Sequence, residues 1–482
     1  RSDTVPPVLG LDSDGDGLSD YEELLLGADP AAGLRVGDRV DLNLAALAGD
    51  GRTVRLLGKP PAGLRFDPVS GRLMGLLGGV PGLYDLQLLV LESGMVVRAI
   101  NLPLAVEAFP PRLLAGYEAL VETPEGQPLG ILRVSVTRPS LWSGSLELLG
   151  AGRRSGAGSF ELVPGRSRAE LRLVFKAAGA APEAVVELNL DTATALVDGR
   201  LTAGVGEGVL RGHRLTTLAG SPPTARRLTL ALDPGVQNGI DYPAGFGWAK
   251  GSVSNRGVVA FKGQLGDAQA FAMAANLGVN GQALVWVQPY KNKQSYLGGV
   301  LPMPDVGQPA PVAESLLPGM QWFKAADEKE RSYAEGFAEP LALTGHAQPF
   351  HPVKTATELA TQLDLPESLL SIEIESEVLS NAEGAMVSLP TALRLAANFA
   401  LTVAEPATGF VPWSGKINKA DGGVTGVLTL PARDTHLAGK APLSGVLLPG
   451  LSPEATVGIG LIQVPVTGKK GQFRTASLLL EK

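Results

Sequence analysis

The chain has 482 residues, of which 45% are hydrophobic, 18% are charged and none is cysteine. The absence of cysteine excludes disulfide bonds, cysteine-ligated zinc and thiol catalysis. The net charge is −7 without clusters of basic residues, which argues against a nucleic-acid partner.

At this length, the usual domain size predicts three or four domains. The 61 glycines and 37 prolines fit many short strands joined by turns, so we predict a mostly β fold. No run of apolar residues is long enough for a transmembrane helix, and no membrane span is expected. The chain begins at Arg1 without a signal sequence, and we interpret it as the processed form of a secreted protein.

One acidic stretch near the N-terminus has a spacing that predicts a metal site. Residues 12–23 read DSDGDGLSDYEE. Calcium takes about six to eight oxygen ligands, which a twelve-residue loop supplies from positions 1, 3, 5, 7, 9 and 12. The sixth position must turn sharply, and it is Gly17. The predicted calcium ligands are Asp12, Asp14, Asp16, the carbonyl oxygen of Leu18, Asp20 and Glu23.

The charge distribution supports this EF-hand-like loop. Residues 1–30 hold eight acidic residues and one basic residue, whereas the other 452 residues hold 40 of each. Without a cation, the crowded carboxylates repel one another. We therefore expect calcium to order the loop and to stabilise whatever packs on it.

The loop lacks the first helix of a full EF-hand, because Pro6 and Pro7 prevent a regular helix before it. It resembles the thrombospondin type 3-like calcium repeat of bacterial extracellular proteins, whose pattern D-x-D-x-D-G-L-S-D-x-x-E precedes G-x-D-P. Residues 27–30 read GADP and match that ending. The resemblance implies calcium binding outside the cell. Such repeats usually occur in tandem, and a single copy favours a rigid clip over a signalling role.

Residues 31–109 are predicted to form one β-sandwich. Residues 36–44 and 82–90 alternate apolar and polar side chains, as strands do. Residues 60–75, PPAGLRFDPVSGRLMG, resemble the core motif of an Ig-like family of bacterial surface proteins. That resemblance implies extracellular display and no catalysis.

The same motif predicts a tight turn and a core. Asp67-Pro68 followed by Ser70-Gly71 is typical of a turn between two strands. The expected core residues of this module are Leu64, Phe66, Leu73 and Tyr84.

The remainder of the chain is similar to β-repeat regions at the C-termini of large secreted bacterial proteins, which bring no known activity. Residues 245–265, Trp322-Phe323-Lys324 and residues 333–337 carry the resemblance. Residues 310–317 and 355–363 could form short helices, and residues 356–363 carry an apolar face at helical spacing. The expected division is a calcium-binding segment, the Ig-like module and three β-repeat sandwich or barrel domains, at residues 1–30, 31–109, 110–222, 223–352 and 353–482.

Motifs for catalysis are missing from the sequence, and we predict that the protein is not an enzyme. No histidine has the neighbours of a metal site, and no G-x-S-x-G elbow occurs. Glu373 and Glu375 could be a glycosidase pair, but their alternation with apolar residues is typical of a solvated strand face. The four histidines are interpreted as surface or satisfied residues: His213, His346, His351 and His436.

Five tryptophans could stack on sugars, although packing in small β cores explains them as well. Trp286 is the best candidate for an exposed binding residue. The leading hypothesis is an extracellular or cell-surface structural protein that assembles head to tail with copies of itself. Residues 4–9 or 476–480 could add a strand to a neighbour. The alternatives are an adhesin that binds surface glycans, or a non-catalytic part of a larger secreted protein.

Overall fold

The structure is a computed structural model, and it describes residues 34–49, 51–162, 168–177, 183–191, 195–204, 206–216, 224–235, 237, 240–304, 316, 319–365, 368–374, 379, 392–404, 412–431, 438–449, 456–466 and 471–482. These residues are mostly β, with one α-helix and two short 3-10 helices. No helix among them is long and apolar enough to cross a membrane. The mostly β fold expected from the composition is therefore confirmed.

The chain divides into two compact units. The first holds the described residues up to Tyr117 together with Arg133–Ser145 and Arg154–Leu210. The second holds Glu118–Leu132, Leu146–Arg153 and the described residues from Arg211 to Lys482.

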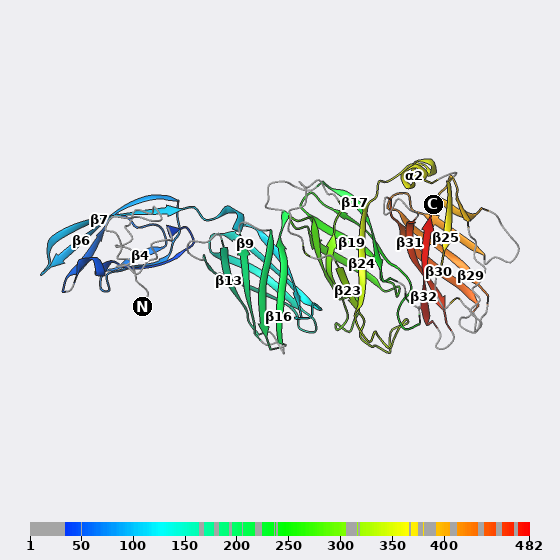
Figure 1. The fold of residues 1–482 in the computed structure, drawn as a ribbon, viewed down its shortest axis with the longest axis horizontal. Helices are drawn as coiled ribbons and strands as arrows, with labels where there is room; N and C mark the ends of the chain where they lie inside the picture. The colour runs from blue at the N-terminus through cyan, green and yellow to red at the C-terminus, as the bar shows by residue number, and fades with distance from the viewer. Residues whose placement is uncertain are drawn as a thin grey trace, which may run out of the picture. The chain divides into compact units, whose positions relative to one another are not determined.

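The N-terminal part of the first unit contains two sheets, drawn in blue in Figure 1. A four-stranded sheet has the order β1 (Leu34–Arg35), β7 (Met95–Glu107), β6 (Gly82–Glu92) and β3 (Thr53–Leu57). A three-stranded sheet has the order β2 (Arg39–Asn43), β5 (Arg72–Leu76) and β4 (Leu64–Asp67), and the 3-10 helix η1 (Leu44–Ala48) follows β2. Apolar residues from both sheets form the buried core, including Leu42, Leu73, Leu88 and Leu102. A β domain at this place is confirmed, while its Ig-like character stays a prediction.

The predicted turn lies between β4 and β5. The Asp67 carboxylate accepts hydrogen bonds from the Val69 amide at 3.0 Å and from the Ser70 hydroxyl at 2.6 Å. The Gly71 amide donates to the Asp67 carbonyl oxygen at 2.8 Å. Gly71 has a φ of +67°, a conformation that glycine adopts without strain. These contacts confirm the tight turn expected from the sequence.

The core expected for this module is only partly as predicted. Leu64 and Leu73 are buried, whereas Phe66 and Tyr84 are half-buried. The Tyr84 hydroxyl reaches the edge of the domain and donates to the Val80 carbonyl oxygen at 2.7 Å. Because the Tyr84 hydroxyl keeps this hydrogen bond at the edge of the domain, its side chain is less completely buried than a leucine in the core.

A nine-stranded sheet follows, after the 3-10 helix η2 (Pro111–Leu113). Its order is β11 (Gly152–Ser159), β10 (Leu141–Leu148), β9 (Pro128–Arg138), β8 (Gly116–Glu122), β16 (Gly206–Arg214), β15 (Leu196–Ala203), β14 (Ala184–Asp191), β13 (Arg168–Phe175) and β12 (Glu161–Leu162). Trp142 of β10 packs on Phe175 of β13 with ring centroids 5.8 Å apart. The sheet therefore curves around an apolar interior.

The second unit contains an eight-stranded sheet that curls into a barrel. Its order is β20 (Ala270–Asn276), β19 (Val258–Gln264), β18 (Gly247–Val253), β17 (Arg226–Asp233), β24 (Leu341–Pro349), β23 (Gly319–Phe323), β22 (Tyr296–Pro302) and β21 (Gln282–Val287). A bridge between Leu277 and Ala283 brings the two ends of this order together. Phe261, Trp322 and Tyr333 fill the interior.

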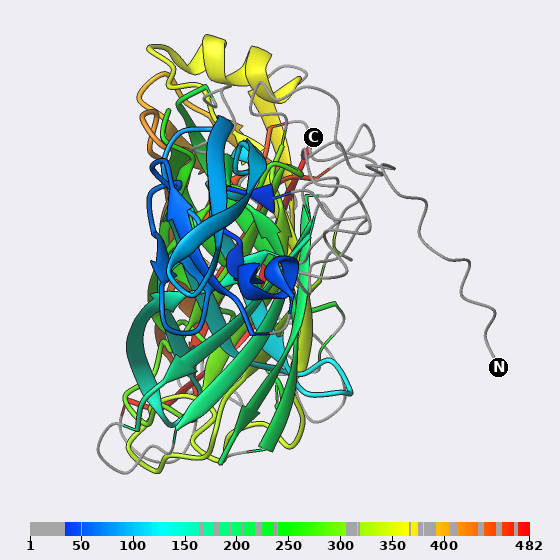
Figure 2. The ribbon, with the colours of Figure 1, turned by 90° about the vertical axis from the view of Figure 1, so that its left-hand side faces the viewer.

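The last part of the second unit is a closed eight-stranded barrel. Its strands, in order, are β25 (Leu369–Glu373), β26 (Ala392–Leu395), β27 (Ala400–Val403), β28 (Trp413–Ile417), β29 (Gly423–Leu430), β30 (Gly439–Leu447), β31 (Thr456–Pro465) and β32 (Phe473–Glu481). The helix α2 (Ala356–Leu363) packs Leu359 and Leu363 on the barrel core. Figure 1 shows α2 at one end of this barrel, and the same helix is the yellow coil at the top of Figure 2.

Two sequence predictions fall on this part of the chain. The helix expected at residues 355–363 is confirmed by α2, whereas most of the helix expected at residues 310–317 lies outside the described residues. The C-terminal strand was expected to be available to a neighbouring molecule. In the structure, β32 is part of the closed barrel, where it is hydrogen-bonded to β31 along its length and to β25 at Leu479–Glu481.

Candidate functional site

The predicted calcium ligands lie outside the described residues, because residues 1–33 are not among them. Within the residues that are described, no group of three or more histidine, aspartate or glutamate side chains could hold a metal ion. The six ligands Asp12, Asp14, Asp16, Leu18, Asp20 and Glu23 therefore stay a prediction from their spacing.

The other candidates from the sequence do not come together as a catalytic site. Glu373 is exposed on β25, while Glu375 lies outside the described residues. His346 is half-buried and His351 is exposed. His213 is fully buried in β16, and burial lowers the pKa of its imidazole to about 4. A histidine with that pKa is neutral at physiological pH.

Trp286 was expected to be the best exposed binding residue, and this expectation is wrong. Its side chain is 8% exposed and belongs to a buried cluster with Leu120, Ile131 and Tyr296. The indole stacks on the Tyr296 ring, with centroids 5.6 Å apart and planes 20° apart. A side chain covered in this way is unable to offer a flat face to a sugar.

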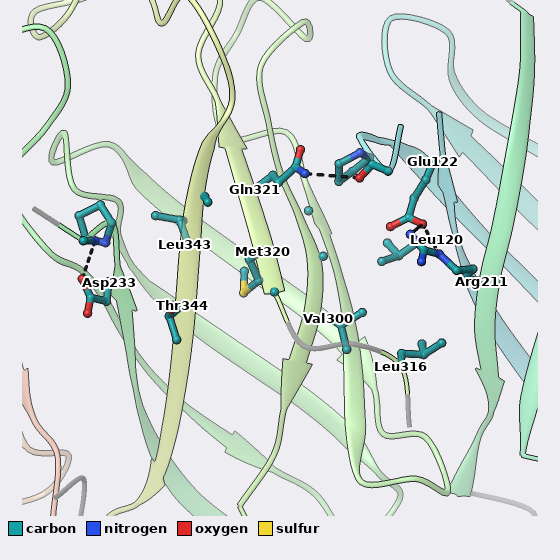
Figure 3. Close-up of a pocket in the computed structure, with 18 residues that line it drawn as sticks. Leu120, Glu122, Arg211, Asp233, Val300, Leu316, Met320, Gln321, Leu343 and Thr344 are labelled. Atoms are coloured by element: carbon teal, nitrogen blue, oxygen red, sulfur yellow. Dashed lines mark hydrogen bonds and ion pairs between the residues drawn. The ribbon is translucent and has the colours of Figure 1, made fainter. Parts of the chain in front are cut away.

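A cavity of about 530 Å³ lies in the second unit, beside β22, β23 and β24 (Figure 3). Three consecutive strands supply its apolar surface, through Val300 on β22, Met320 on β23 and Leu343 on β24. Leu120 on β8 and Leu316 add to the same surface. A volume of this size is in the usual range for small-molecule sites.

Polar groups stand at the edge of this cavity. The Arg211 guanidinium donates to the Glu122 carboxylate, through Nε at 2.6 Å. The Glu122 side chain is 11% exposed and the Arg211 side chain is 51% exposed, so the pair marks where the cavity meets solvent. The Gln321 amide nitrogen donates to the Gly126 carbonyl oxygen at 3.4 Å, as Figure 3 shows. The amide oxygen of Gln321 is buried and accepts no hydrogen bond.

Two glycines of β22 shape the cavity wall. A Cβ on Gly299 would lie 2.3 Å from the Gly319 carbonyl oxygen, and a Cβ on Gly298 would lie 3.0 Å from the Pro128 side chain. Glycine inside a strand often marks such a close backbone approach. The run YLGGVLP was therefore the signal from which this wall could have been inferred. Sequence reasoning missed the cavity, since its other residues come from distant strands.

The arrangement has features that small-molecule sites share. An apolar surface with polar groups at its edge offers both packing and hydrogen-bonding contacts to a ligand. Glu122 is held by Arg211, and Asp233 is the other carboxylate that lines the cavity.

Comparison with known proteins bears on the N-terminal segment. Residues 12–31 match the family described as the bacterial TSP3 repeat. This match supports the thrombospondin type 3-like calcium repeat inferred from the loop, and it suggests calcium as a ligand and an extracellular location. It covers a small part of the chain. No match was found among curated proteins.

Among solved structures, the chain is similar to the crystal structure of the isotype 1 transferrin binding protein B from serogroup B Neisseria meningitidis. The sequence identity is 11%, and the similarity covers 92% of this chain and 89% of that chain. The TM-score is 0.18, too low to indicate a shared arrangement.

Proposed function

We propose that the chain is a non-enzymatic extracellular structural protein, a calcium-stabilised subunit of a bacterial surface filament, sheath or layer. Copies would assemble through β-rich contacts, head to tail. The TSP3 match supports the calcium and the location. The observation that carries the structural role is the contact between the two barrels of the second unit, which we call the barrel interface.

The apolar part of the barrel interface is a buried cluster. Ala231 of β17 packs with Val446, Leu448 and Ile459 from the closed barrel, and each of these side chains is at most 3% exposed. Burial of apolar surface contributes about 25 cal/mol per Å², so this cluster favours the contact between the barrels.

Hydrogen bonds cross the same interface. The Trp248 indole donates to the Ser444 hydroxyl at 3.1 Å, and that hydroxyl donates to the Gln264 side chain at 2.6 Å. The Phe246 amide donates to the Gly460 carbonyl oxygen at 3.2 Å. Gly245 makes this approach possible, because a Cβ there would lie 2.7 Å from the Leu461 Cβ.

Two ion pairs at the rim of the barrel interface help to orient the barrels and contribute little to the free energy of their association. Lys250 contacts Asp421 at 3.0 Å and Arg474 contacts Glu335 at 2.7 Å. Exposed pairs of this kind contribute about 0–1 kcal/mol each. Apolar packing, the hydrogen-bond network and the oriented charges together support a stiff connection between the two barrels. A subunit that carries mechanical force in a filament needs such a connection.

Assembly also needs free strand edges. Among the described strands, β11 and β12 are terminal in the order of the nine-stranded sheet, although Phe160 alone separates them in the chain. We propose the side of β11 that does not pair with β10 as the edge for strand addition. Residues 4–9 read TVPPVL and are mostly apolar, and they are the segment that we propose for a neighbour's edge.

Negative-stain microscopy of the purified chain tests this proposal, first with calcium and then with a chelator. We expect long regular polymers that loosen or dissolve on chelation. Deletion of residues 1–10 removes the proposed strand and leaves the calcium ligands in place, so it should give monodisperse particles with calcium. Monodisperse particles of the intact chain in both conditions would contradict the filament.

A second candidate is a surface protein that binds a ligand, as an adhesin does. The cavity beside β22 favours it, with its apolar wall and the polar groups at its edge. Because Trp286 is buried, we place the binding site in this cavity rather than on an exposed tryptophan. A glycan array probed with the monomer, and repeated with Val300→Trp to fill the cavity, tests this alternative. Binding that the substitution leaves unchanged would rule out the cavity.

A further inference from the structure

A buried lysine and a buried aspartate face each other at one end of the eight-stranded barrel. Lys324 directly follows β23, and Asp267 lies in the turn between β19 and β20. The Lys324 Nζ atom is 2.7 Å from the Asp267 Oδ2 atom, and each side chain is 1% exposed. The carboxyl carbon Cγ lies one bond beyond the oxygen that Lys324 contacts, so the amine is held next to the atom that it would attack.

Both oxygens of the Asp267 carboxyl group are held by donors. The Tyr290 hydroxyl donates to Oδ2 at 2.8 Å, and the Gln269 amide donates to Oδ1 at 3.0 Å. Burial, together with the neighbouring Asp267, raises the pKa of Tyr290 well above its usual value, so the phenol keeps its proton. The Trp322 indole in turn donates to the Tyr290 oxygen at 3.2 Å. Fixed donors of this kind stabilise an oxyanion in a dry site.

The lysine is oriented from its other side. Its Nζ atom donates to the Ser332 carbonyl oxygen at 2.6 Å and lies 4.9 Å from the centre of the Tyr290 ring. Glu330 Oε2 is 4.0 Å from the same nitrogen. The Glu330 side chain is 23% exposed, so it links the buried pair to solvent.

We propose that Lys324 and Asp267 condense to an isopeptide bond that covalently links the β19–β20 turn to the segment after β23. A proton first moves from the ammonium to the carboxylate along their hydrogen bond. The free amine then attacks Cγ, and the electron pair of the C=O bond moves to Oδ1, which the Gln269 amide holds.

The rest of the reaction releases water. Glu330 takes a proton from the attacking nitrogen and delivers it to the Oδ2 hydroxyl, which leaves as water when the C–Oδ2 bond breaks and the carbonyl re-forms. Glu330 is a carboxylate again at the end of the reaction. The net change is an ammonium and a carboxylate converted to an amide and one water, so no other reactant is required.

The competing interpretation is a permanent buried ion pair. Its electrostatic cost favours condensation, because taking two charges out of water carries a penalty of several kcal/mol per ion. The neutral amide removes both charges. Most of the described ion pairs have at least one exposed partner. Their charges are hydrated, so condensation to an amide is expected at few of the described pairs.

Intact-mass spectrometry of the purified full chain tests the proposal directly. We expect a mass lower by one water than the sequence requires, and a cross-linked peptide containing Lys324 and Asp267 after digestion. The Lys250–Asp421 pair is the matched control, since it has the same two residue types at 3.0 Å but with both side chains 32% exposed. That pair should stay unlinked.

Two variants locate the chemistry. Lys324→Arg keeps the positive charge but cannot form the amide, so it should restore the unlinked mass. Glu330→Gln keeps the shape and removes the proton carrier, so a large unlinked fraction is expected. The unmodified mass in the natural chain, or a cross-link at other residues, would overturn the proposal, and neither result depends on whether a variant folds.

Discussion

His213 lies buried in β16, where desolvation lowers the pKa of its imidazole to about 4, and the nearby Asn280 amide offsets only part of this effect. The unfolded chain binds the proton near the ordinary histidine pKa of about 6.5. Stability contributed by the neutral imidazole is therefore complete above about pH 6.5 and is lost as the pH falls toward 4. The shift corresponds to at most about 3 kcal/mol.

We expect the urea midpoint of the chain to fall between pH 6.5 and 4, and His213→Gln to flatten that fall. His351→Gln serves as the control, because His351 is exposed. If both variants give the same pH dependence as the natural chain, His213 does not control it.

The calcium loop carries a second prediction at the scale of single residues. Glu23 occupies the last ligand position, which is bidentate in loops of this length, whereas the adjacent Glu22 is not at a ligand position. We expect Glu23→Gln to lower calcium affinity by about tenfold or more, and Glu22→Gln to change it little. Isothermal titration calorimetry measures both. Equal losses would mean that the loop binds by charge alone.

The calcium loop and the sites formed by tertiary packing differ in how much of each the sequence predicts. All six calcium ligands come from one short loop, so their spacing is visible in the sequence. Lys324 and Asp267 are 57 positions apart, and no local pattern connects them. The cavity residues are spread from β8 to β24 for the same reason. Sites built by tertiary packing leave little trace in a single sequence.

The helix α2 shows what local signals can predict at the scale of the element. Thr355 accepts a hydrogen bond from the Glu358 amide at 3.1 Å, and the Glu358 carboxylate accepts one from the Lys354 amide at 2.7 Å. We expect Thr355→Ala to destabilise the chain by about 1 kcal/mol, and Thr355→Ser to have little effect. Urea denaturation of both variants checks this difference. Equal stabilities would mean that packing alone holds α2.

The strand β21 shows where local signals fail. Its apolar run was compatible with one exposed face, which led to the wrong expectation for Trp286. In the structure, Ala283 and Val285 face the barrel interior while Leu284 and Trp286 join a second buried cluster. A strand buried on both faces has no alternation from which to choose an exposed residue. Only the packing of other strands on its outer face decides this.

At the scale of the molecule, the barrel interface predicts cooperative unfolding of the second unit. The rim ion pairs are too weak to couple two barrels, so the coupling depends on the apolar cluster around Val446. An uncompensated charge placed there costs several kcal/mol, because a lysine at a fully buried position has no partner. We therefore expect Val446→Lys to separate one calorimetric transition into two.

Val258→Lys is the matched control, since Val258 lies on β19 with 39% of its surface exposed and should tolerate the charge. Differential scanning calorimetry of the two variants and the natural chain distinguishes the possibilities. One transition in all three proteins would show that the barrels are coupled by something other than the cluster. Two transitions in the natural chain would remove the stiff connection on which the proposed structural role depends, because barrels that unfold independently transmit little force to each other.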